Sequence, residues 1–298
     1  MLFQNTSPFQ KRASFREKLK SGKLLRFPGA WSPLVAMQIE KMGFDGVYIS
    51  GSVLSNDLGY PDVGLTTLSE VAQRGRQIAR VTKLPSIIDI DTGFGVPMNA
   101  ARSVSELIEL GLAGCHLEDQ ENPKRCGHLD GKSLVPANEM IMKIKAASDA
   151  KKMDPNFLII ARTDARASEG LDKAIDRAKA YIDAGAEMIF PEALANEGEF
   201  EQFRKAVSVP LLANMTEFGK SKLLNTKQLE NLGFNVVIYP VTTLRLAMKA
   251  VETGLKIIQQ EGSQESAVPM MQTRKELYEL TSYEEYNQFD QNIYNFKV

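Results

Sequence analysis

The strongest constraint on the fold is a regular alternation of two kinds of segment along the 298 residues. Short β-rich runs occupy residues 24–27, 46–50, 86–90, 113–117, 157–161, 187–190, 209–213 and 235–239. Segments with helical spacing alternate with them at residues 32–43, 68–82, 101–111, 138–152, 171–185, 197–207, 226–233 and 242–262. Eight such units predict an α/β protein, specifically a (β/α)8 TIM-type barrel. A doubly wound open sheet is disfavoured, because it usually has fewer strands or a second domain.

Residues at the helix ends support this alternation. The same residue type closes four of the helical segments just before a β-rich run: Gly43, Gly111, Gly185 and Gly233. Glycine commonly ends a helix because it adopts the left-handed backbone conformation without steric cost. At the start of another helix, Ser32 is placed as the N-cap and Pro33 as the first helical residue.

The two ends of the chain frame a single predicted barrel domain, residues 1–298. Residues 1–12 look loosely ordered, and residues 14–23 have the pattern of a short amphipathic helix. A barrel is already complete at residue 262, so residues 263–298 are an addition. This tail is predicted to be helical, and its aromatic residues are Tyr278, Tyr283, Tyr286, Phe289, Tyr294 and Phe296. We expect such a tail to pack on a neighbouring subunit, which predicts an oligomer.

Charge and hydrophobicity exclude several classes of protein. Lys and Arg number 36 against 37 Asp and Glu, so the net charge of −1 gives no field that attracts nucleic acid or an anionic membrane. No apolar run approaches the ~20 residues of a membrane span, and the N-terminal MLFQNTSPFQKR lacks the apolar core of a secretory signal. Two cysteines make no disulfide framework. These features predict a soluble, cytoplasmic protein.

Polar side chains gather where the predicted strands end. In a (β/α)8 barrel these ends form the active site. The groups in question are Tyr48, Ser50, Gly51 and Ser52; Asp89 and Asp91; His116 and Glu118; Arg162 and Asp164; Glu192; Asn214 and Thr216; and Arg245. Because strand side chains alternate, Asp89 with Asp91, His116 with Glu118, and Arg162 with Asp164 are each expected on one face of their strand. A single polar residue at a strand end more often caps a helix or pairs with an arginine, but so many together indicate a functional rim.

The composition of this rim suggests its ligands. Asp89, Asp91 and Glu118 offer the oxygen ligands that Mg²⁺ prefers while it keeps several waters. The alternative is a carboxylate cluster neutralised by Arg162 or Lys124. Zinc is disfavoured, because the two cysteines and two histidines have no ligand spacing. Arg162 and Arg245, with Arg125 as a further candidate, suit bidentate capture of carboxylates. The rim therefore predicts chemistry on a small polycarboxylate.

A charged loop with two glycines carries a candidate reactive thiol. Cys126 stands among Lys124, Arg125 and His128, a basic setting of the kind that lowers the pKa of a cysteine. The alternative is a solvated loop whose cysteine is incidental. Nucleotide-binding and serine-hydrolase motifs are not found, since GFGVP lacks the GxGxxG and P-loop patterns and DGVYISGS lacks GxSxG.

Four motifs carry a family resemblance. KRCGH (124–128), IDIDTGFG (88–95), HLEDQ (116–120) and LLANMTEFG (211–219) resemble the 2-methylisocitrate lyases of the isocitrate lyase and phosphoenolpyruvate mutase superfamily, over about residues 12–290. The resemblance implies a Mg²⁺-dependent barrel, with Mn²⁺ as a possible substitute, in a homotetramer that exchanges its last helix between subunits. It also implies cleavage of 2-methylisocitrate to pyruvate and succinate in the methylcitrate cycle of propionate breakdown.

The resemblance also assigns roles to residues. It implies Asp89 and Asp91 as metal ligands, with Glu118 in or near the metal's shell. The implied substrate-binding positions are Ser50, Gly51, Ser52, Asp62, Cys126, Gly127, Arg162, Glu192, Asn214, Met215, Thr216, Arg245 and Arg274. Phe190, Ile238 and Pro240 would line the pocket for the substrate methyl group. In the mechanism that we expect, Cys126 is the general acid, Arg162 and His128 stabilise developing charge, and the base is Tyr48 or Glu118 acting through water.

Three alternatives stay open. Leu129, which follows KRCGH, is more typical of isocitrate lyases, although the short chain and the sequence IFPEAL are not. Relatives that cleave oxaloacetate or phosphonopyruvate share the acidic rim but generally lack the cysteine motif. A barrel retained as a binding or assembly protein would have lost at least one of the key side chains, which are Asp89, Asp91, Cys126 and Arg162; all four are present.

Overall fold

Eight parallel strands form the centre of the molecule within residues 6–129 and 131–295, which the computed structural model describes. They are β1 (Leu25–Pro28), β2 (Val47–Ile49), β3 (Ser86–Asp89), β4 (Gly114–Glu118), β5 (Leu158–Thr163), β6 (Met188–Pro191), β7 (Leu212–Asn214) and β8 (Val236–Tyr239). Each lies at a predicted β-rich run, so the eight strand predictions are confirmed. Their ends differ from prediction by a few residues, which is the usual uncertainty of an element boundary.

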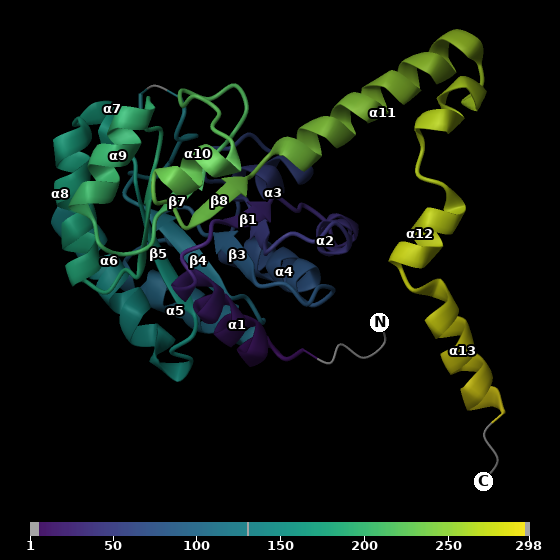
Figure 1. The fold of residues 1–298 in the computed structure, drawn as a ribbon, viewed down its shortest axis with the longest axis horizontal. Helices are drawn as coiled ribbons and strands as arrows, with labels where there is room; N and C mark the ends of the chain where they lie inside the picture. Colours follow the sequence, from purple (N-terminus) through teal and green to yellow (C-terminus); the bar gives the residue numbers. More distant parts are fainter. Residues whose placement is uncertain (1–5, 130, 296–298) are drawn as a thin grey trace.

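The strands follow one another in space in the order of the chain. One sheet has the order β2-β3-β4-β5-β6 and the other the order β1-β8-β7, and every pairing is parallel. Single parallel bridges link the two sheets at both seams, from Gly29 to Tyr48 and from Ile189 to Leu211. The chain is therefore a parallel α/β protein, with helices packed around the strands (Figure 1).

The helices alternate with the strands as predicted. They are α1 (Pro8–Lys20), α2 (Pro33–Lys41), α3 (Gly51–Asp57), α4 (Leu68–Ala79), α5 (Pro97–Glu109), α6 (Ala137–Ala150), α7 (Ala165–Ser168), α8 (Leu171–Asp183), α9 (Glu197–Ala206), α10 (Thr226–Asn231), α11 (Thr242–Glu261), α12 (Arg274–Leu280) and α13 (Tyr283–Tyr294). Short 3-10 helices cover Lys151–Met153 and Glu265–Met270. The four helix-ending glycines have φ between 75° and 111°, which confirms their predicted role.

Two hydrophobic layers result from the alternation of side chains along each strand. The inner layer includes Phe27, Tyr48, Ile160, Phe190 and Ile238, and the outer layer packs the other strand face against the helices. These inner side chains fill the space between the strands. The polar groups at the strand ends therefore stand on a packed hydrophobic base.

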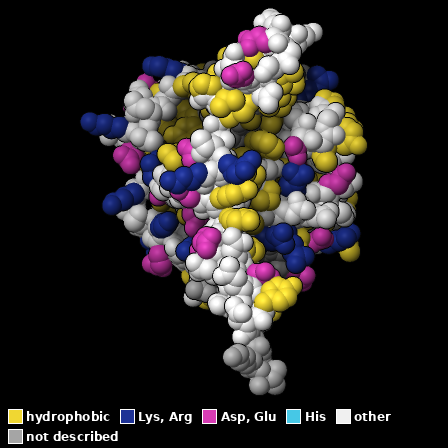
Figure 2. All heavy atoms as spheres, turned by 90° about the vertical axis from the view of Figure 1, so that its right-hand side faces the viewer, with side chains coloured by type: hydrophobic (Ala, Val, Ile, Leu, Met, Phe, Trp, Pro, Cys, Tyr) yellow, Lys and Arg dark blue, Asp and Glu magenta, His cyan; other side chains and the backbone are white. Residues whose placement is uncertain are grey.

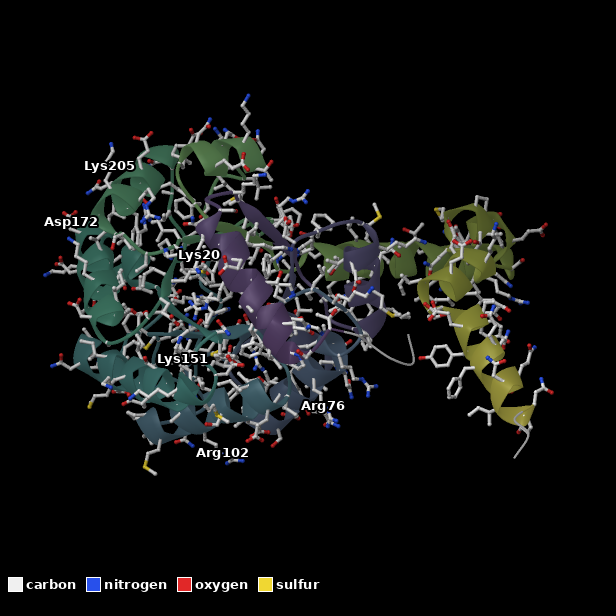
Figure 3. The ribbon with its side chains drawn as sticks, turned by 60° about the horizontal axis from the view of Figure 1, so that its bottom comes forward. Lys20, Arg76, Arg102, Lys151, Asp172 and Lys205 are labelled. Atoms are coloured by element: carbon white, nitrogen blue, oxygen red, sulfur yellow. The ribbon has the colours of Figure 1, made fainter. Side chains whose placement is uncertain are left out.

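The N-terminal helix corrects one expectation. Helix α1 begins at Pro8, so residues 8–12 are helical, not loosely ordered; residues 1–5 lie outside the described part. The segment was expected to be loosely ordered because charged residues are usually exposed, whereas here they are buried. Arg12 is buried and donates to the backbone carbonyls of Leu112 and Ile108. Phe15 joins the inner layer from below, and Figure 3 shows α1 lying across this end of the body beside the labelled Lys151.

The last three helices form an arm that leaves the body (Figure 1). In α11, all of which is described, no side chain is buried, although its sequence is amphipathic. Helix α12 returns near α2, where Lys41 lies 3.9 Å from Glu279. The predicted helical tail is confirmed as far as Tyr294, and Phe296 lies outside the described residues. Figure 2 shows hydrophobic side chains gathered along the arm and the neighbouring body surface.

None of the helices in the described part of the chain has the length and apolar character needed to cross a membrane.

Candidate active site

Arg162 at the end of β5 is the centre of a buried polar cluster. The strand register sets Arg162 opposite Glu118 of β4, and its Nη1 lies 3.1 Å from Glu118 Oε2. The same guanidinium donates to both carboxylate oxygens of Asp164, at 2.9 and 3.1 Å, and its Nη2 lies 3.4 Å from Oε2 of Glu192, which directly follows β6. One planar cation thus holds three buried carboxylates in fixed relative positions.

A second acidic group lies at the ends of β2 and β3. Asp89 accepts hydrogen bonds from the backbone N–H groups of Gly51 (3.1 Å) and Asp91 (3.0 Å). Asp91 has a φ of 46°, a left-handed backbone conformation that aspartate tolerates better than most residues. Lys124 forms ion pairs with Asp91, at 2.9 Å, and with Asp62. A Cβ atom at Gly51 would lie 3.0–3.1 Å from carboxylate oxygens of both aspartates, so a larger residue there would push against the acidic group.

The surroundings set different protonation preferences for these acids. Burial raises the pKa of Asp91 to about 6 despite the Lys124 ammonium. Burial also opposes ionisation of Asp89, but the charges of His116, Lys124 and Arg162 outweigh it, and the pKa of Asp89 lies below its usual value. At Glu118 burial outweighs Arg162, and its pKa lies well above the usual value. A divalent cation beside these groups would favour the ionised form of each.

The donor set fits a hard divalent cation with few protein ligands. Both carboxylate oxygens of Glu118 are buried and receive no hydrogen bond from the described residues, although Arg162 lies 3.1 Å from one of them. Buried carboxylate oxygens normally have a donor, so a water or a cation is expected there. Among the described residues, no group of three or more His, Cys, Asp or Glu is arranged to hold a metal ion. Mg²⁺ suits this situation because one or two carboxylates plus waters suffice.

The KRCGH loop closes over this cluster. His128 Nε2 lies 2.9 Å from Glu192 Oε1, and His128 Nδ1 accepts a hydrogen bond of 2.9 Å from the backbone N–H of Lys220. Asn214 Nδ2 at the end of β7 lies within 3.4 Å of both His128 and Glu192. The structure therefore brings the predicted residues His128, Glu192 and Asn214 together with Arg162.

At Gly127 the loop backbone lies against the cluster. A Cβ atom at this position would overlap Arg162 Nη2 and lie 2.5 Å from Glu192 Cγ. Only glycine therefore allows the loop backbone to lie against these two side chains.

We expect Gly127→Ala to reduce kcat by about 100-fold, because the methyl group must displace either the loop or Arg162 by about 1 Å. Steady-state kinetics test this, with circular dichroism to confirm folding. The control is Gly198→Ala in α9, where the nearest atom to an added Cβ is Asn196 Oδ1 at 3.2 Å. An unchanged kcat in Gly127→Ala would contradict the close contact.

Cys126 is not the activated thiolate that its basic neighbours suggested. Burial raises the pKa of the Cys126 thiol, and a hydrogen bond from the backbone of His128 only partly opposes this. The neighbouring basic side chains are directed elsewhere, since Lys124 pairs with Asp62 and Asp91, and His128 contacts Glu192. The thiol keeps its proton at neutral pH, which suits a proton donor better than a nucleophile.

Burial disfavours the ionised form of both candidate bases. Tyr48 shares a 2.7 Å hydrogen bond with His116 Nε2, and burial together with Asp89 raises the pKa of Tyr48 well above its usual value. Burial lowers the pKa of His116. Because burial raises the pKa of Glu118 as well, the geometry favours neither base over the other.

The predicted methyl pocket borders the inner layer. The ring of Phe190 packs edge-on against His116, with centroids 5.3 Å apart, and the Arg162 guanidinium lies 5.2 Å from its centroid. Ile238 is fully buried in the same layer, and Pro240 is buried beside Gly29.

Four predicted substrate-binding residues lie around the cluster with various roles. Ser50 caps α3 by accepting from the N–H of Val53 at 3.4 Å, while Ser52 and Thr216 are half-buried. Met215 packs in the outer layer, where its sulfur accepts from the N–H of Leu224 at 3.2 Å. The side chain of Met215 therefore points away from the polar cluster.

The two late arginines are not part of the buried cluster in a single chain. Arg245 at the start of α11 donates to the carbonyl of Glu217 at 2.7 Å and lies over the ring of Phe218. Arg274 is exposed at the start of α12, on the arm.

Sequence reasoning missed two supports of the site. Asp119 is buried and accepts hydrogen bonds from Thr163 Oγ1 (2.8 Å), the N–H of Asp164 (2.9 Å) and the hydroxyl of Tyr181 (2.8 Å), which fixes the end of β5. Lys132 is buried in an ion pair with Asp164. Asp119 lies within the HLEDQ motif, but its hydrogen-bond partners are more than 40 residues away in the sequence, so the motif gave no indication of its role.

A cavity of about 420 Å³ opens beside the aspartates. Asp91 and Asn122 line it together with residues from the starts of α4 and α5, among them Thr67, Asn99 and Arg102. Because Cys126, Arg162 and Glu192 are not part of its wall, the cavity adjoins the acidic group and not the Arg162 cluster.

Comparison with known proteins gives one consistent result. The model of the phosphoenolpyruvate phosphomutase family matches residues 15–259. A protein of Corynebacterium glutamicum named "Probable 2-methylisocitrate lyase 1" is 57% identical over 97% of this chain and 94% of its own. The 2-methylisocitrate lyase of Halalkalibacterium halodurans is 50% identical over 94% and 92%. The crystal structure of phosphonopyruvate hydrolase with oxalate and Mg²⁺ is 30% identical, with a TM-score of 0.85 over 94% of this chain and 98% of its own.

The fold, the site and the matches to known proteins together define the class of this protein. It is a parallel α/β enzyme of the phosphoenolpyruvate mutase and isocitrate lyase superfamily, and its polar groups lie at the carboxyl ends of the strands. The extent of the sequence identity then narrows the class. The chain belongs to the 2-methylisocitrate lyase family.

Proposed function

We propose that this protein is a carbon–carbon lyase that cleaves 2-methylisocitrate to pyruvate and succinate. The observation that carries the proposal is the cluster of Arg162, Glu192 and His128 beneath the Cys126 loop. It combines a fixed guanidinium for a substrate carboxylate with a protonated thiol held by the same loop as His128. The family membership of the chain supports the same reaction.

We propose Mg²⁺ as the cofactor, with Mn²⁺ as a substitute. Asp89 and Asp91 would hold the ion, and Glu118, whose oxygens lack hydrogen-bond donors among the described residues, would lie in or near its shell. A relative, phosphonopyruvate hydrolase, has been crystallised with Mg²⁺ and oxalate. When bound, the cation supplies Lewis acidity that lowers the pKa of a substrate hydroxyl.

In the proposed mechanism, one residue of the chain accepts a proton from the substrate and another donates a proton to the product. Tyr48 or Glu118, the latter through a water, accepts the proton of the substrate hydroxyl. The carbon–carbon bond breaks, the pyruvate fragment keeps the new carbonyl group, and the electron pair passes to the succinate fragment. Arg162 and His128 stabilise the negative charge of that fragment. The Cys126 thiol donates the proton that completes succinate, and the closed loop excludes water.

The choice between this substrate and isocitrate depends on one methyl group. Phe190, Ile238 and Pro240 would shape the pocket that accepts it, and one methyl discriminates by only about 1–3 kcal/mol. Leu129, which favoured an isocitrate lyase, is 58% exposed, so its side chain is a weak guide to the pocket. Isocitrate therefore remains an expected minor substrate.

The proposal extends to the assembly. We propose that the bridges at both seams close the eight strands into one (β/α)8 barrel, which forms a single domain with its tail. The exposed apolar side chains of α11 to α13 support exchange of the arm between subunits of a homotetramer. In that arrangement Arg274 would serve a neighbouring subunit. A place in cytoplasmic propionate catabolism follows from the proposed substrate.

A product assay tests the function. The purified protein, Mg²⁺ and either 2-methylisocitrate or isocitrate are mixed, and the released 2-oxo acid is identified. We expect pyruvate from the methylated substrate, little glyoxylate from isocitrate, and no product in EDTA until Mg²⁺ or Mn²⁺ is returned in excess. Dominant glyoxylate would favour isocitrate lyase. No product from either substrate would reject the lyase and reopen the oxaloacetate-cleaving and binding-protein alternatives.

A further inference from the structure

Lys132 lies at the end of the KRCGH loop and has no role in the reaction described above. Its side chain is nevertheless as buried as those of the residues that take part in the reaction. Its side chain is only 2% exposed. The ammonium forms an ion pair of 2.9 Å with Asp164 Oδ1 and donates a hydrogen bond to the backbone carbonyl of Gly127. A buried ammonium is costly unless it is fully paired, so both contacts are needed to hold it there.

The two partners of Lys132 belong to two different parts of the site, the loop that carries Cys126 and the cluster around Arg162. The carbonyl of Gly127 is one peptide away from Cys126, the proposed proton donor. Asp164 holds the Arg162 guanidinium through two hydrogen bonds of 2.9 and 3.1 Å. A single ammonium therefore connects the backbone beside the proton donor to the residue that orients the carboxylate-binding arginine.

Other contacts hold the base of the loop but not its tip. The side chain of Gln120 bonds both the N–H and the carbonyl of Arg125, each at 2.9 Å, and the N–H of Glu121 donates to the carbonyl of Ser133 at 2.9 Å. The tip, residues 126–128, is held by the side chain of His128 and by the hydrogen bond from Lys132. Of these two residues, only Lys132 contacts the backbone of the tip, at the carbonyl of Gly127.

We propose that Lys132 is a positioning residue that latches the tip of the loop onto β5 and so places Cys126 for proton transfer. The inference rests on the proposed lyase function. Lys132 does not touch substrate; it acts through the backbone of Gly127 and through Asp164. Without the latch, the closed loop is less populated, Cys126 becomes accessible, and the substrate fragment waits longer for its proton.

Lys132→Met tests the latch, because it removes the charge and both hydrogen bonds from a side chain of similar length. We expect kcat to fall by about 10- to 100-fold, with KM changed by less than about threefold, because positioning is lost while the carboxylate-binding side chains remain. Lys132→Arg, which keeps a charged donor, should recover part of kcat. Lys152→Met, on an exposed 3-10 helix, is the matched control.

Alkylation by iodoacetamide gives a readout that does not depend on turnover. The chain has two free cysteines, and Cys115 is fully buried in the outer hydrophobic layer. Opening of the loop exposes Cys126 alone, whereas loosening of the whole protein exposes both. Peptide mass spectrometry separates the two rates. In Lys132→Met we expect Cys126 to react at least about fivefold faster and Cys115 at its original rate.

Each outcome decides the proposal. Faster alkylation of Cys126 alone, together with the lower kcat, supports the latch. Unchanged alkylation of Cys126 overturns it whatever happens to kcat, and equal acceleration at both cysteines assigns Lys132 a merely structural role. If Lys132→Met does not fold, the same comparison is made in Lys132→Arg. A wild-type protein without lyase activity would reject the proposed function, but the alkylation rates would still decide whether the loop is latched.

Discussion

Cys126→Ser is expected to lower kcat by about 10²- to 10⁴-fold, the usual contribution of a positioned general acid, with a smaller change in KM. Serine is nearly isosteric, so the loop and its contacts to Arg162 and Glu192 should persist. Its hydroxyl is a far weaker acid than a thiol, and the succinate fragment would have to take its proton from a poorer donor.

The pH profile of the unmodified enzyme gives a second check on Cys126. A general acid works while it is protonated, so activity is lost as pH rises through its pKa. Burial raises the pKa of Cys126, so activity limited by this group should persist to a pH above the normal range of a thiol. Cys115→Ala is the control and should leave kcat unchanged, because Cys115 lies in the outer layer. Near-normal turnover of Cys126→Ser would remove Cys126 from the role of acid.

Arg162→Lys is expected to reduce kcat/KM by about 10²- to 10³-fold, comparable to the loss of a donor that stabilises developing charge. Lysine keeps the charge but offers a single point in place of a planar fork. It cannot hold Glu118, Asp164 and Glu192 at once. Because a buried carboxylate then loses its partner, the free energy of unfolding should also fall, on the order of 3 kcal/mol.

Arg166→Lys is the matched control for that substitution. Arg166 also forms a two-pronged pair, with Glu199 at 2.7 and 2.9 Å, but the pair is partly exposed. Its loss should change the free energy of unfolding by at most about 1 kcal/mol and leave kcat unaltered. Denaturant unfolding and steady-state kinetics on both variants test the contrast. Equal effects at the two arginines would show that the buried cluster has no special importance.

Most of the fold could be predicted from the sequence because it depends on local patterns. The β-rich runs, the helical spacing and the glycines at helix ends are all properties of neighbouring residues. Two kinds of element escaped this reasoning. Helix α3 (Gly51–Asp57) follows its strand without a loop, and the start of α1, ahead of the helix predicted over residues 14–23, is held by long-range hydrogen bonds from Arg12 to carbonyls about 100 residues away. Such partners cannot be inferred from spacing.

The residues that form the site could be predicted from the sequence, but their pKa values and contacts could be predicted less well. Strand alternation and shared rim position brought Glu118, Arg162 and Glu192 together correctly. The pKa of Cys126 was predicted to be lowered and is instead raised, because neighbours in sequence were taken as neighbours in space. Lys124 and His128 turn to carboxylates, and burial then decides the pKa of the thiol. Lys132 carried no sequence signal, since its partners are a backbone carbonyl and a residue 32 positions away.

The contacts of Phe190 tie substrate choice to turnover. Its ring borders the proposed methyl pocket, and the same ring packs against His116 and beneath the Arg162 guanidinium. A smaller residue there would widen the pocket, but it would also free the arginine and the histidine that shares a hydrogen bond with Tyr48. Evolution or engineering toward bulkier substrates at this site therefore has to trade selectivity against rate, unless a second change elsewhere restores the lost support.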